Sequence, residues 1–415
     1  MISRNLPLIM FVVAVGIIIF FAGFAVWHFE VFPYPQILSA KHFVEDWKSE
    51  LGIGPTKLLV SARDPNRTIV RFYSADRLAP GNVLISGLIR DKNSLYGVGL
   101  FDRDGKRLHY WPIDPSSLTE KTDDRSVFDV FPHGVLVRPD GTLFVNFDDM
   151  PSTVRVSACG EQEWAAKNGA HHAIFIDHEN QIWTLLQKSA IGVIDANTGE
   201  IEKSISISQD VIIPHNLHGH FDLRTTEREL DPDDLDEIYW FHMNDVEIVS
   251  PIVAEASSVL EVGDAVVSLR EINTILAFDP ESGMPRWWQT GPWHRQHDLD
   301  LQSGGTIVLF DNNMGKGVSR ILRFDPVSRE VEVMFEGSDA FPFYSWRRGK
   351  QDLLENGNLL VTVSEEGRVL EVSSKGELLW EFNLIFDDDR NGIINKAMIL
   401  TESYFDAGAL DCGNN

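Results

Sequence analysis

Short apolar runs alternate with turn residues along most of the chain, from about Asn82 to Phe382. One recurring segment is an apolar strand, a turn with glycine or asparagine, and a second apolar strand. Asp-Gly, Asn-Gly and Gly-Gly between alternating apolar runs are strong signals of β-hairpins. The segments are HGVLVRPDGTLFVNF (133–147), HAIFIDHENQIWTLL (172–186), HDLDLQSGGTIVLF (297–310) and GKQDLLENGNLLVTV (349–363).

A second kind of hairpin alternates with the first, and its second strand often carries tryptophan. The segments are VGLFDRDGKRLHYW (98–111), VRVSACGEQEW (154–164), IGVIDANTGEIEKSI (191–205), ILAFDPESGMPRWW (275–288), ILRFDPVSREVEVMF (321–335) and VLEVSSKGELLWEF (369–382). Four-stranded repeats of about 40–50 residues are typical of propeller blades. Because long amphipathic helices are absent, we predict an all-β fold: a six-bladed β-propeller of four-stranded antiparallel blades, preceded by an N-terminal transmembrane helix.

The propeller is expected over residues 81–385. Residues 28–80 are expected to form a membrane-proximal segment, with a short helix around 42–51. A strand pair at 57–72 is expected to close the ring by completing the last blade, since this protects a sheet edge. Residues 386–415 are expected to form a C-terminal tail.

The transmembrane helix is predicted from the uncharged segment Leu6 to Trp27 (6–27). A helix of this length spans the roughly 30 Å core of a bilayer, and cleaved signal peptides usually have a shorter apolar region of about 7–15 residues. The alternative is cleavage near Gly23 to Ala25. Since Arg4 precedes the segment and Glu30 follows it, residues 1–5 are expected to be a cytoplasmic tail. This orientation predicts a single-pass protein of the inner (plasma) membrane, with its propeller on the periplasmic side.

The chain is strongly acidic, with 62 acidic against 36 basic residues and a net charge of −26. Phosphate binding needs a basic face, so a nucleic-acid partner is not expected. An anionic small ligand would need a local positive pocket. The two cysteines, Cys159 and Cys412, are too few for a disulfide scaffold or a cysteine-based zinc site. They could pair in an exported protein, but we expect two unpaired thiols.

Three further segments are expected to lie in loops. DDDRNG (387–392) matches the start of a calcium loop, but Met398 stands where the twelfth position requires glutamate, so we do not expect calcium there. LDPDDLDE (230–237) is expected to be a solvated loop. Ile248 to Val262 is expected to be an insertion in the fourth blade.

Histidine recurs at one position of the first kind of hairpin. Eight residues before the turn residues Gly141, Asn180 and Gly305 stand His133, His172 and His297, whereas Gly349 stands eight before Gly357. His242 precedes the longer fourth blade and is expected to belong to the same ring. The innermost strands of a propeller surround a channel, so their first residues converge at one end of it. The alternative is that each histidine closes a loop and has no chemical role.

Arg270 ends a predicted strand of the fourth blade and is expected to enter the same site. Its planar fork suits a tetrahedral oxyanion, and its charge disfavours the rival interpretation of a His₃ metal site. The alternative is an ion pair with Glu271 or Glu247. Asp298 adjoins His297, but strand alternation points it to the opposite face. His294 lies before the strand and is expected to be a rim residue.

The chain from Trp240 to Phe382 resembles the arylsulfotransferase-like family of exported six-bladed propellers. The resemblance is carried, in order, by WFHMND (240–245), VVSLREINTILAFDPESG (266–283), RQHDLDLQSGGTIVLFDNN (295–313), SRILRFDP (319–326) and KQDLLENGNLLVTVSEEGRVLEVSSKGELLWEF (350–382). Upstream of this region the resemblance rests on the blade pattern and on HHAIFID (171–177).

The resemblance implies an aryl-sulfate sulfotransferase that passes a sulfuryl group to a phenolic acceptor by a ping-pong mechanism. The Gln-His-Asp element implies that His297 is the histidine that carries the group. The resemblance implies four catalytic residues: His297, His242, Arg270 and His172. Beside them we expect three substrate-binding residues: Asn244, His171 and His133. No metal is expected, because Arg270 is expected in the same site and the nearby carboxylates match no zinc motif. No cofactor is expected, and GKGVS (315–319) lacks the spacing of a nucleotide-phosphate loop.

Two other functions compete with sulfuryl transfer. One is a non-catalytic propeller that binds a small anionic or phenolic ligand, or a protein partner, at the same mouth. The other is a metal-dependent hydrolase. Family members carry a separate N-terminal β domain that helps them dimerise, and too few residues precede the first blade here to form one. The resemblance therefore leaves the oligomeric state open.

Overall fold

The computed structural model describes most of the chain. The described residues are 6–29, 58–89, 96–113, 118, 132–148, 150–187, 189–221, 241–339 and 341–412. The expected tail at 1–5, the helix around 42–51 and the acidic loop at 230–237 lie outside them. The chain divides into two units, Met1–Thr56 with Thr119–Asp129 and Lys57–Leu118 with Val130–Asn415.

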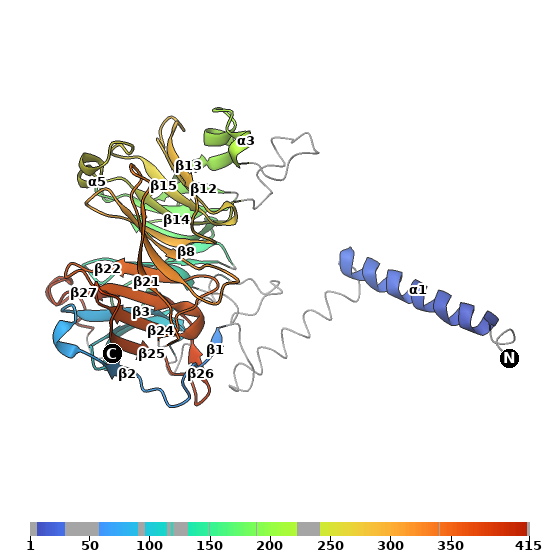
Figure 1. Cartoon of the computed structure of the whole chain (residues 1–415), viewed down its shortest axis with the longest axis horizontal. Coiled ribbons are helices and arrows are strands. Elements are labelled where there is room, and N and C mark those ends of the chain that lie inside the picture. The colour runs from blue at the N-terminus through green and yellow to red at the C-terminus, as the bar shows by residue number, and fades with distance from the viewer. Residues whose placement is uncertain are drawn as a thin grey trace. The chain divides into compact units, whose positions relative to one another are not determined.

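The first unit contains the helix α1 (Leu6–His28), which covers the apolar segment found in the sequence (Figure 1). Within the part of the chain that the structure describes, no helix has both the length and the apolar character needed to cross a membrane. The transmembrane anchor therefore stays a prediction.

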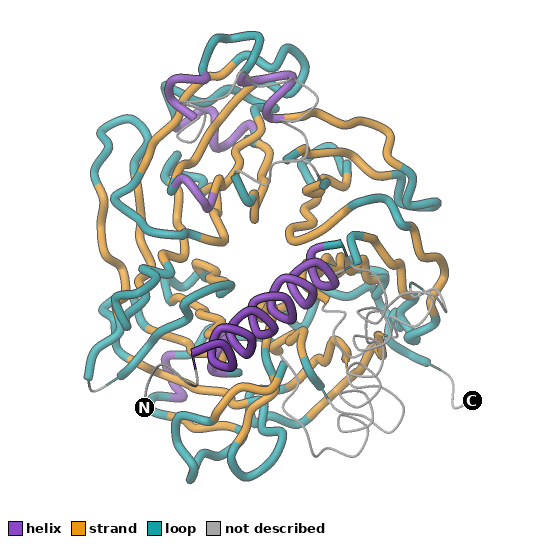
Figure 2. Tube along the Cα trace, turned by 90° about the vertical axis from the view of Figure 1, so that its right-hand side faces the viewer, coloured by secondary structure: helices purple, strands orange, loops and turns teal. Residues whose placement is uncertain are grey.

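The second unit is an all-β propeller with six antiparallel blades, as the two hairpin patterns predict (Figures 1 and 2). From innermost to outermost strand, the first three blades are β27 (Ile394–Leu400), β3 (Asn82–Gly87), β4 (Tyr96–Phe101), β5 (Arg107–Ile113); β6 (Pro132–Val137), β7 (Leu143–Phe147), β8 (Ser152–Val156), β9 (Gln162–Ala166); and β10 (Ala170–Ile176), β11 (Ile182–Leu186), β12 (Ala190–Ile194), β13 (Ile201–Ser206). The last three are β14 (Met243–Ile248), β15 (Ala265–Leu269), β16 (Thr274–Phe278), β17 (Pro285–Thr290); β18 (His297–Leu301), β19 (Ile307–Asp311), β20 (Arg320–Phe324), β21 (Val331–Glu336); and β22 (Lys350–Leu353), β23 (Leu359–Val363), β24 (Arg368–Val372), β25 (Leu378–Asn383).

The six innermost strands form a closed ring. Each contacts the next, in the order β27, β6, β10, β14, β18, β22 and back to β27. Figure 2 shows the strands arranged around the axis. Their equivalent residues therefore face one another across a central channel, which is the arrangement that the histidine spacing requires.

The ring closes differently from the expectation. The innermost strand of the first blade is β27, which pairs with β3 and comes from the segment expected to be a C-terminal tail. The strand β2 (Val70–Phe72) instead adds a fifth, outermost strand to the last blade by pairing with β25. Nearby, β1 (Leu59–Ser61) pairs with β26 (Arg390–Gly392). The end of the chain thus completes its first blade and leaves no open edge at the axis.

The turn residues that set the histidine count share one backbone conformation. Gly141, Asn180, Gly305 and Gly357 all have positive φ, between 64° and 83°. Glycine and asparagine tolerate this left-handed conformation, so the hairpin register is fixed at the same place in each of these blades. This is why counting back from the turn reaches equivalent positions.

The remaining helices are short. The fourth blade carries α5 (Pro251–Ala256) within the predicted insertion. A π-helix (Ile207–Ile212) and α3 (His218–Phe221) follow the third blade. Three-residue 3₁₀ helices lie at Ala75–Arg77, Arg270–Ile272 and Ser364–Glu366.

The core lies between neighbouring blades. Between the last two blades, Phe310, Ile321, Val361 and Leu370 belong to one buried cluster. Tryptophans of the outer strands also join blades: the Trp111 indole Nε1 donates a hydrogen bond of 3.0 Å to the Gly141 carbonyl of the next blade. These contacts hold the blades in register and so fix the ring of inner strands.

Cys159 and Cys412 form a disulfide, with 5.5 Å between their Cα atoms. The expectation of two unpaired thiols is therefore wrong. The residues are 253 positions apart in sequence, and only the folded ring brings them together. Cys159 lies in the turn between β8 and β9 of the second blade, and Cys412 follows β27, so the bond ties the end of the closing strand to the blade beside it.

Candidate functional site

One end of the channel opens into a cavity of about 380 Å³. The innermost strands begin at this end, and the antiparallel second strands finish there, so both contribute side chains. The lining residues are His133, Asp148, Pro151, His171, His172, Ser189, His242, Met243, Arg270, His297, Trp346, Arg347 and Arg348. Every predicted site residue except Asn244 therefore lies in one cavity, although these residues come from four blades.

The inner strands are irregular where they reach the cavity. Register shifts fall at Pro132/Val135, His171/Ile174, Met243/Asp245 and His297/Leu299. His172 and His242 also have positive φ, 50° and 43°. Bulges re-aim side chains and often lie beside active sites, and non-glycine residues with positive φ are uncommon outside constrained positions. The inner strands are thus bent where they present the imidazoles.

His297 is held from behind by Asn312. Its Nδ1 lies 2.6 Å from the Asn312 Oδ1. The Asn312 amide nitrogen donates to the carbonyls of Ser345 and Arg348 at 2.8 and 2.6 Å. Because these bonds fix the amide orientation, Oδ1 must accept and the His297 Nδ1 must carry the proton. The other ring nitrogen, Nε2, then keeps its lone pair, in a residue that lines the cavity.

Asn244 lies behind the cavity and does not line it. It is buried, and its amide nitrogen donates to the Gln296 carbonyl at 2.7 Å. The structure therefore places Asn244 as a support for the backbone just before His297. The residue was expected to contact substrate, and it is not among the residues that line the cavity.

Arg270 combines the two alternatives considered from the sequence. It lines the cavity, and its Nη1 also donates to the Glu271 carboxylate at 2.7 Å. Arg295 pairs with the same carboxylate from outside the cavity. One acid between two arginines leaves a positive charge at the cavity wall, as the binding of an anion requires.

The expectation for Asp298 is confirmed, since its carboxylate faces away from His297. It pairs with the Lys350 Nζ at 2.7 Å and accepts the backbone N–H of Gln351. His294 is exposed and does not line the cavity, as expected of a rim residue.

Burial keeps most of the imidazoles uncharged. It lowers the pKa of His297 and His133 well below the ordinary value, and Arg270 lowers the pKa of His297 further. Burial also lowers the pKa of His242 to about 3 and of His171 to about 4, and the neighbouring His172 adds to both shifts. These four imidazoles are therefore neutral at pH 7, with a lone pair available on one ring nitrogen.

Two sets of cavity residues were not found in the sequence. Asp148 follows β7 directly and has no periodic signal. Trp346, Arg347 and Arg348 lie in the loop between β21 and β22. Trp346 is 37% exposed, and the Arg347 guanidinium lies 4.4 Å from the centre of its ring. Arg347 and Arg348 share Glu365, so this loop brings a second excess positive charge and an aromatic surface to the cavity.

Polar side chains of the calcium-like segment (387–392) make ion pairs and hydrogen bonds with other residues of the chain. The Asp387 carboxylate pairs with Arg390, whose Nε lies 2.7 Å away. The Asn391 side chain bonds to Arg67 and to the Glu366 carbonyl. Among the residues that the structure describes, the one group with metal-ligand spacing is His133, Asp148 and His172.

Fold and cavity together define a six-bladed propeller with a cavity lined by histidines and arginines at one end of its channel. Residues 96–385, more than half of the chain, match the family described as arylsulfotransferase (ASST). The chain therefore belongs to the arylsulfotransferase family, which points to a sulfotransferase and to small aryl sulfates and phenols as substrates. No curated protein matches the chain significantly.

Solved structures show only distant similarity. A protein of unknown function from Bacteroides caccae is 13% identical, with 77% of this chain and 98% of that chain covered and a TM-score of 0.49. A virginiamycin B lyase from Staphylococcus aureus is 13% identical, with 62% and 71% covered and a TM-score of 0.38. BamB from Moraxella catarrhalis is 12% identical, with 76% of each chain covered and a TM-score of 0.32. No functional conclusion rests on these similarities.

Proposed function

We propose that the protein transfers a sulfuryl group from an aryl sulfate to a phenolic acceptor, with His297 as the nucleophile of a ping-pong reaction. The observation that carries the proposal is the state of His297. Its imidazole is neutral, its Nδ1 proton is held by Asn312, its Nε2 keeps a lone pair, and the residue lines the cavity. A neutral imidazole with one free nitrogen is a competent nucleophile at neutral pH.

The surrounding charges suit the transferred group. Sulfuryl transfer should resemble phosphoryl transfer, with an in-line, loose transition state and negative charge on the equatorial oxygens. Arg270 supplies a charged donor in the same cavity, and His172 and His242 supply neighbouring imidazoles. Preorganised donors of this kind stabilise developing charge more than they stabilise the ground state.

The cavity wall also offers an apolar surface for an aryl ring. Trp346, Pro151 and Met243 line the cavity beside the charged groups. Aromatic side chains pack well against aromatic rings. A flat ring with a charged sulfate at one end matches this division of the wall.

We further propose that the protein acts outside the cytoplasm, anchored to the inner membrane by the segment that forms α1. The disulfide between Cys159 and Cys412 supports this location, because disulfides persist mainly in oxidising compartments. The uncharged Leu6–Trp27 segment supports the anchor.

The test is an assay of the full chain with p-nitrophenyl sulfate, with and without phenol. We expect nitrophenol release that depends on the acceptor in steady state and is lost in His297→Ala. The matched control is His294→Ala, which changes an exposed histidine just before the same strand and should keep its activity. Binding of the donor without turnover would instead indicate a non-catalytic propeller.

A metal-dependent hydrolase is the second candidate, and a specific observation favours it. The ligand atoms of His133, Asp148 and His172 lie within 4.8 Å of one another. A chelator distinguishes the two functions. Sulfuryl transfer through His297 needs no metal, so it should survive chelation, whereas loss of activity that zinc restores would favour the hydrolase.

A further inference from the structure

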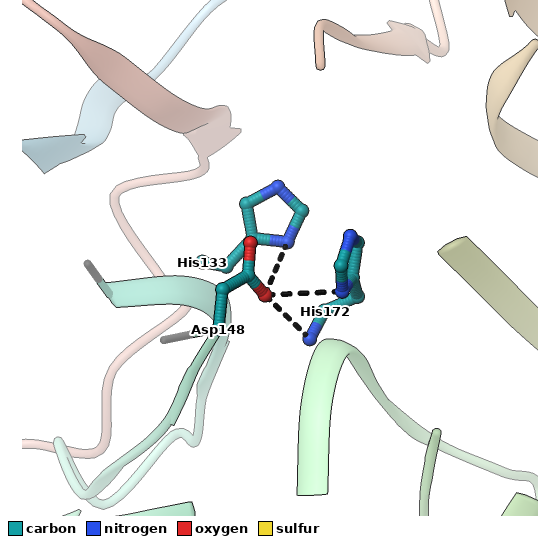
Figure 3. Close-up of side chains that lie close together, drawn as sticks. All are labelled: His133, Asp148 and His172. Atoms are coloured by element: carbon teal, nitrogen blue, oxygen red, sulfur yellow. Dashed lines mark hydrogen bonds and ion pairs between the residues drawn. The ribbon is translucent and has the colours of Figure 1, made fainter. Parts of the chain in front are cut away.

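Asp148 joins two histidines from neighbouring blades. It follows β7 in the second blade, and its Oδ1 lies 3.5 Å from the Nδ1 of His133 in the same blade. The same oxygen lies 3.0 Å from the Nδ1 of His172 in the third blade, and it accepts the His172 backbone N–H at 3.2 Å. Figure 3 shows the carboxylate between the two rings. His172 is thus held by both its backbone and its ring.

These contacts fix the tautomer of His172. A carboxylate only accepts hydrogen bonds, so the proton between Asp148 and His172 sits on the His172 Nδ1. The His171 Nδ1 lies 2.9 Å from the same nitrogen, and it must therefore act as an acceptor there. Figure 3 shows the second ring nitrogen of His172 pointing away from Asp148. That nitrogen, Nε2, is the one available to the cavity that His172 lines.

The contact with His172 is the closer of the two that the Asp148 Oδ1 makes with imidazole nitrogens, at 3.0 against 3.5 Å. Among the described residues that line the cavity, Asp148 is the only acid. Burial raises the pKa of Asp148, but the neighbouring imidazoles and the His172 hydrogen bond outweigh burial and hold the pKa well below its ordinary value. Burial leaves His242 and His171 neutral, with pKa values of about 3 and about 4.

We propose that Asp148 is a positioning residue that makes His172 the proton carrier of the transfer. This inference rests on the proposed function. In the first half-reaction, the His297 Nε2 forms a bond to sulfur while the bond between sulfur and the aryl oxygen breaks. In this step His172 starts with a proton on both ring nitrogens. The departing oxygen takes the proton from the His172 Nε2, which leaves His172 neutral with its Nδ1 proton on the Asp148 side, and a free phenol.

The second half-reaction returns the proton. The acceptor phenol gives its proton to the His172 Nε2 as its oxygen bonds to sulfur. The bond between sulfur and the His297 Nε2 breaks, and the electron pair returns to that nitrogen. The proton therefore stays within the site over a full cycle, and throughout it Asp148 holds the Nδ1 proton of His172. Carboxylate–imidazole pairs serve the same purpose in other transferases and hydrolases, where the acid orients the ring and is not itself protonated.

The role of His172 as a proton donor can be tested by varying the leaving group of the aryl sulfate. A nitrophenolate departs readily without a proton, whereas an unsubstituted phenolate, with a conjugate-acid pKa of about 10, needs one. Loss of proton transfer should therefore be costly for phenyl sulfate and nearly harmless for p-nitrophenyl sulfate. A residue that only supports the fold would affect both donors equally.

The experiment compares kcat/KM of the wild-type chain and Asp148→Asn over aryl sulfates that range from nitrophenyl to unsubstituted phenyl. We expect the variant to slow phenyl sulfate by about 100-fold or more, the usual size of a general acid–base contribution. We expect kcat/KM of the variant to fall by less than about tenfold for p-nitrophenyl sulfate, since the departure of nitrophenolate needs little acid assistance. The matched control, Asp195→Asn at a partly exposed turn of the third blade that does not line the cavity, should leave the dependence on leaving group unchanged.

A second variant keeps the inference testable if Asp148→Asn does not fold. His172→Gln should show the same selective loss, and the double variant should lose no more than either single variant. An equal loss for all donors in both variants would overturn the inference while leaving the proposed function intact. A tightly bound metal at His133, Asp148 and His172 that activity requires would also overturn it. A wild-type chain that transfers no sulfuryl group from any donor would overturn both.

Discussion

The Nδ1 of His297 lies 2.6 Å from the Oδ1 of Asn312, and the Asn312 amide is itself fixed by two backbone carbonyls. This relationship sets the tautomer of the central histidine. Replacing Asn312 by alanine should free the ring and leave Nε2 misaligned. We expect the first half-reaction to slow by about 100-fold, since small misplacements of reacting groups cost this much.

The Asn312 prediction is measured as the pre-steady-state burst of nitrophenol. Asn197→Ala, in an exposed turn of the third blade, is the control for a lost asparagine amide. A burst of unchanged rate in Asn312→Ala, with a native circular dichroism spectrum, would show that the tautomer of His297 does not matter.

Arg270→Lys should keep the charge and lose the planar fork. Since a preorganised donor to a developing oxyanion is worth about 10²–10³-fold in rate, we expect a loss of kcat in that range. Arg295→Lys is the matched control, because Arg295 pairs with the same Glu271 and does not line the cavity. Equal losses in the two variants would mean that Arg270 acts only through its ion pair.

The first half-reaction should tolerate acid. His297 must be neutral to attack sulfur, and burial lowers its pKa well below the ordinary value of 6.5. The imidazole of His297 therefore stays neutral as the pH falls through 6.5. We expect kcat/KM for p-nitrophenyl sulfate, a donor that needs little acid assistance, to stay level between pH 8 and a value well under 6.5. A half-fall near pH 6.5 would contradict the depressed pKa.

Stability should fall as the pH rises through the weakly acidic and neutral range. Beside the cavity, burial raises the pKa of Glu247 to about 8 and of Asp245 to about 6; Asp298 adds to both shifts, and Asp245 adds to the shift of Glu247. Lys350 and Lys396 oppose these shifts without cancelling them. A raised acid pKa contributes stability below the unfolded value of about 4.5, which is lost as the pH approaches the folded value.

Glu247→Gln removes one of these groups and tests this dependence. A single such group changes the free energy of unfolding by at most about 1.4 kcal/mol per pH unit. We expect the Tm of the variant to decline less than that of the wild type between pH 5 and pH 8. Glu330→Gln, at an exposed turn, should decline as the wild type does. Parallel declines of all three proteins would contradict the raised pKa.

Reduction of the disulfide should destabilise the propeller. The Cys159–Cys412 bond spans 253 positions and ties the strand that closes the ring to the second blade. Loss of a native disulfide typically costs about 2–5 kcal/mol. We expect reductant to lower the Tm of the wild type but not of the Cys159→Ser/Cys412→Ser double variant. A wild-type Tm that does not respond to reductant, with thiol titration confirming reduction, would contradict this.

The sequence predicts the blades and the histidine ring because both depend on local signals. Turn residues such as Gly141 and Asn180 fix the register of each inner hairpin, so a count along the chain reaches equivalent positions. The ring of inner strands then brings His133, His172 and His297 into one cavity.

Other features depend on contacts that have no local signal. Nothing in the sequence distinguishes Asp148 from the many other acidic residues of the chain. Its contact with His172 forms only because the second and third blades pack against each other. Asn312 belongs to the Leu-Phe-Asp-Asn element, but its role behind His297 requires the tertiary fold. The pairing of Cys159 with Cys412 and the closing strand β27 both join distant parts of the chain.

The central claim is that His297 carries the sulfuryl group, and trapping that intermediate tests it most directly. The full chain is mixed with p-nitrophenyl sulfate without acceptor, quenched in alkali and mapped by peptide mass spectrometry. We predict one added sulfuryl mass per chain on His297, which disappears when phenol is added before the quench. Acceptor-dependent turnover with no label on His297, or with the label on another residue such as His172, would contradict the account.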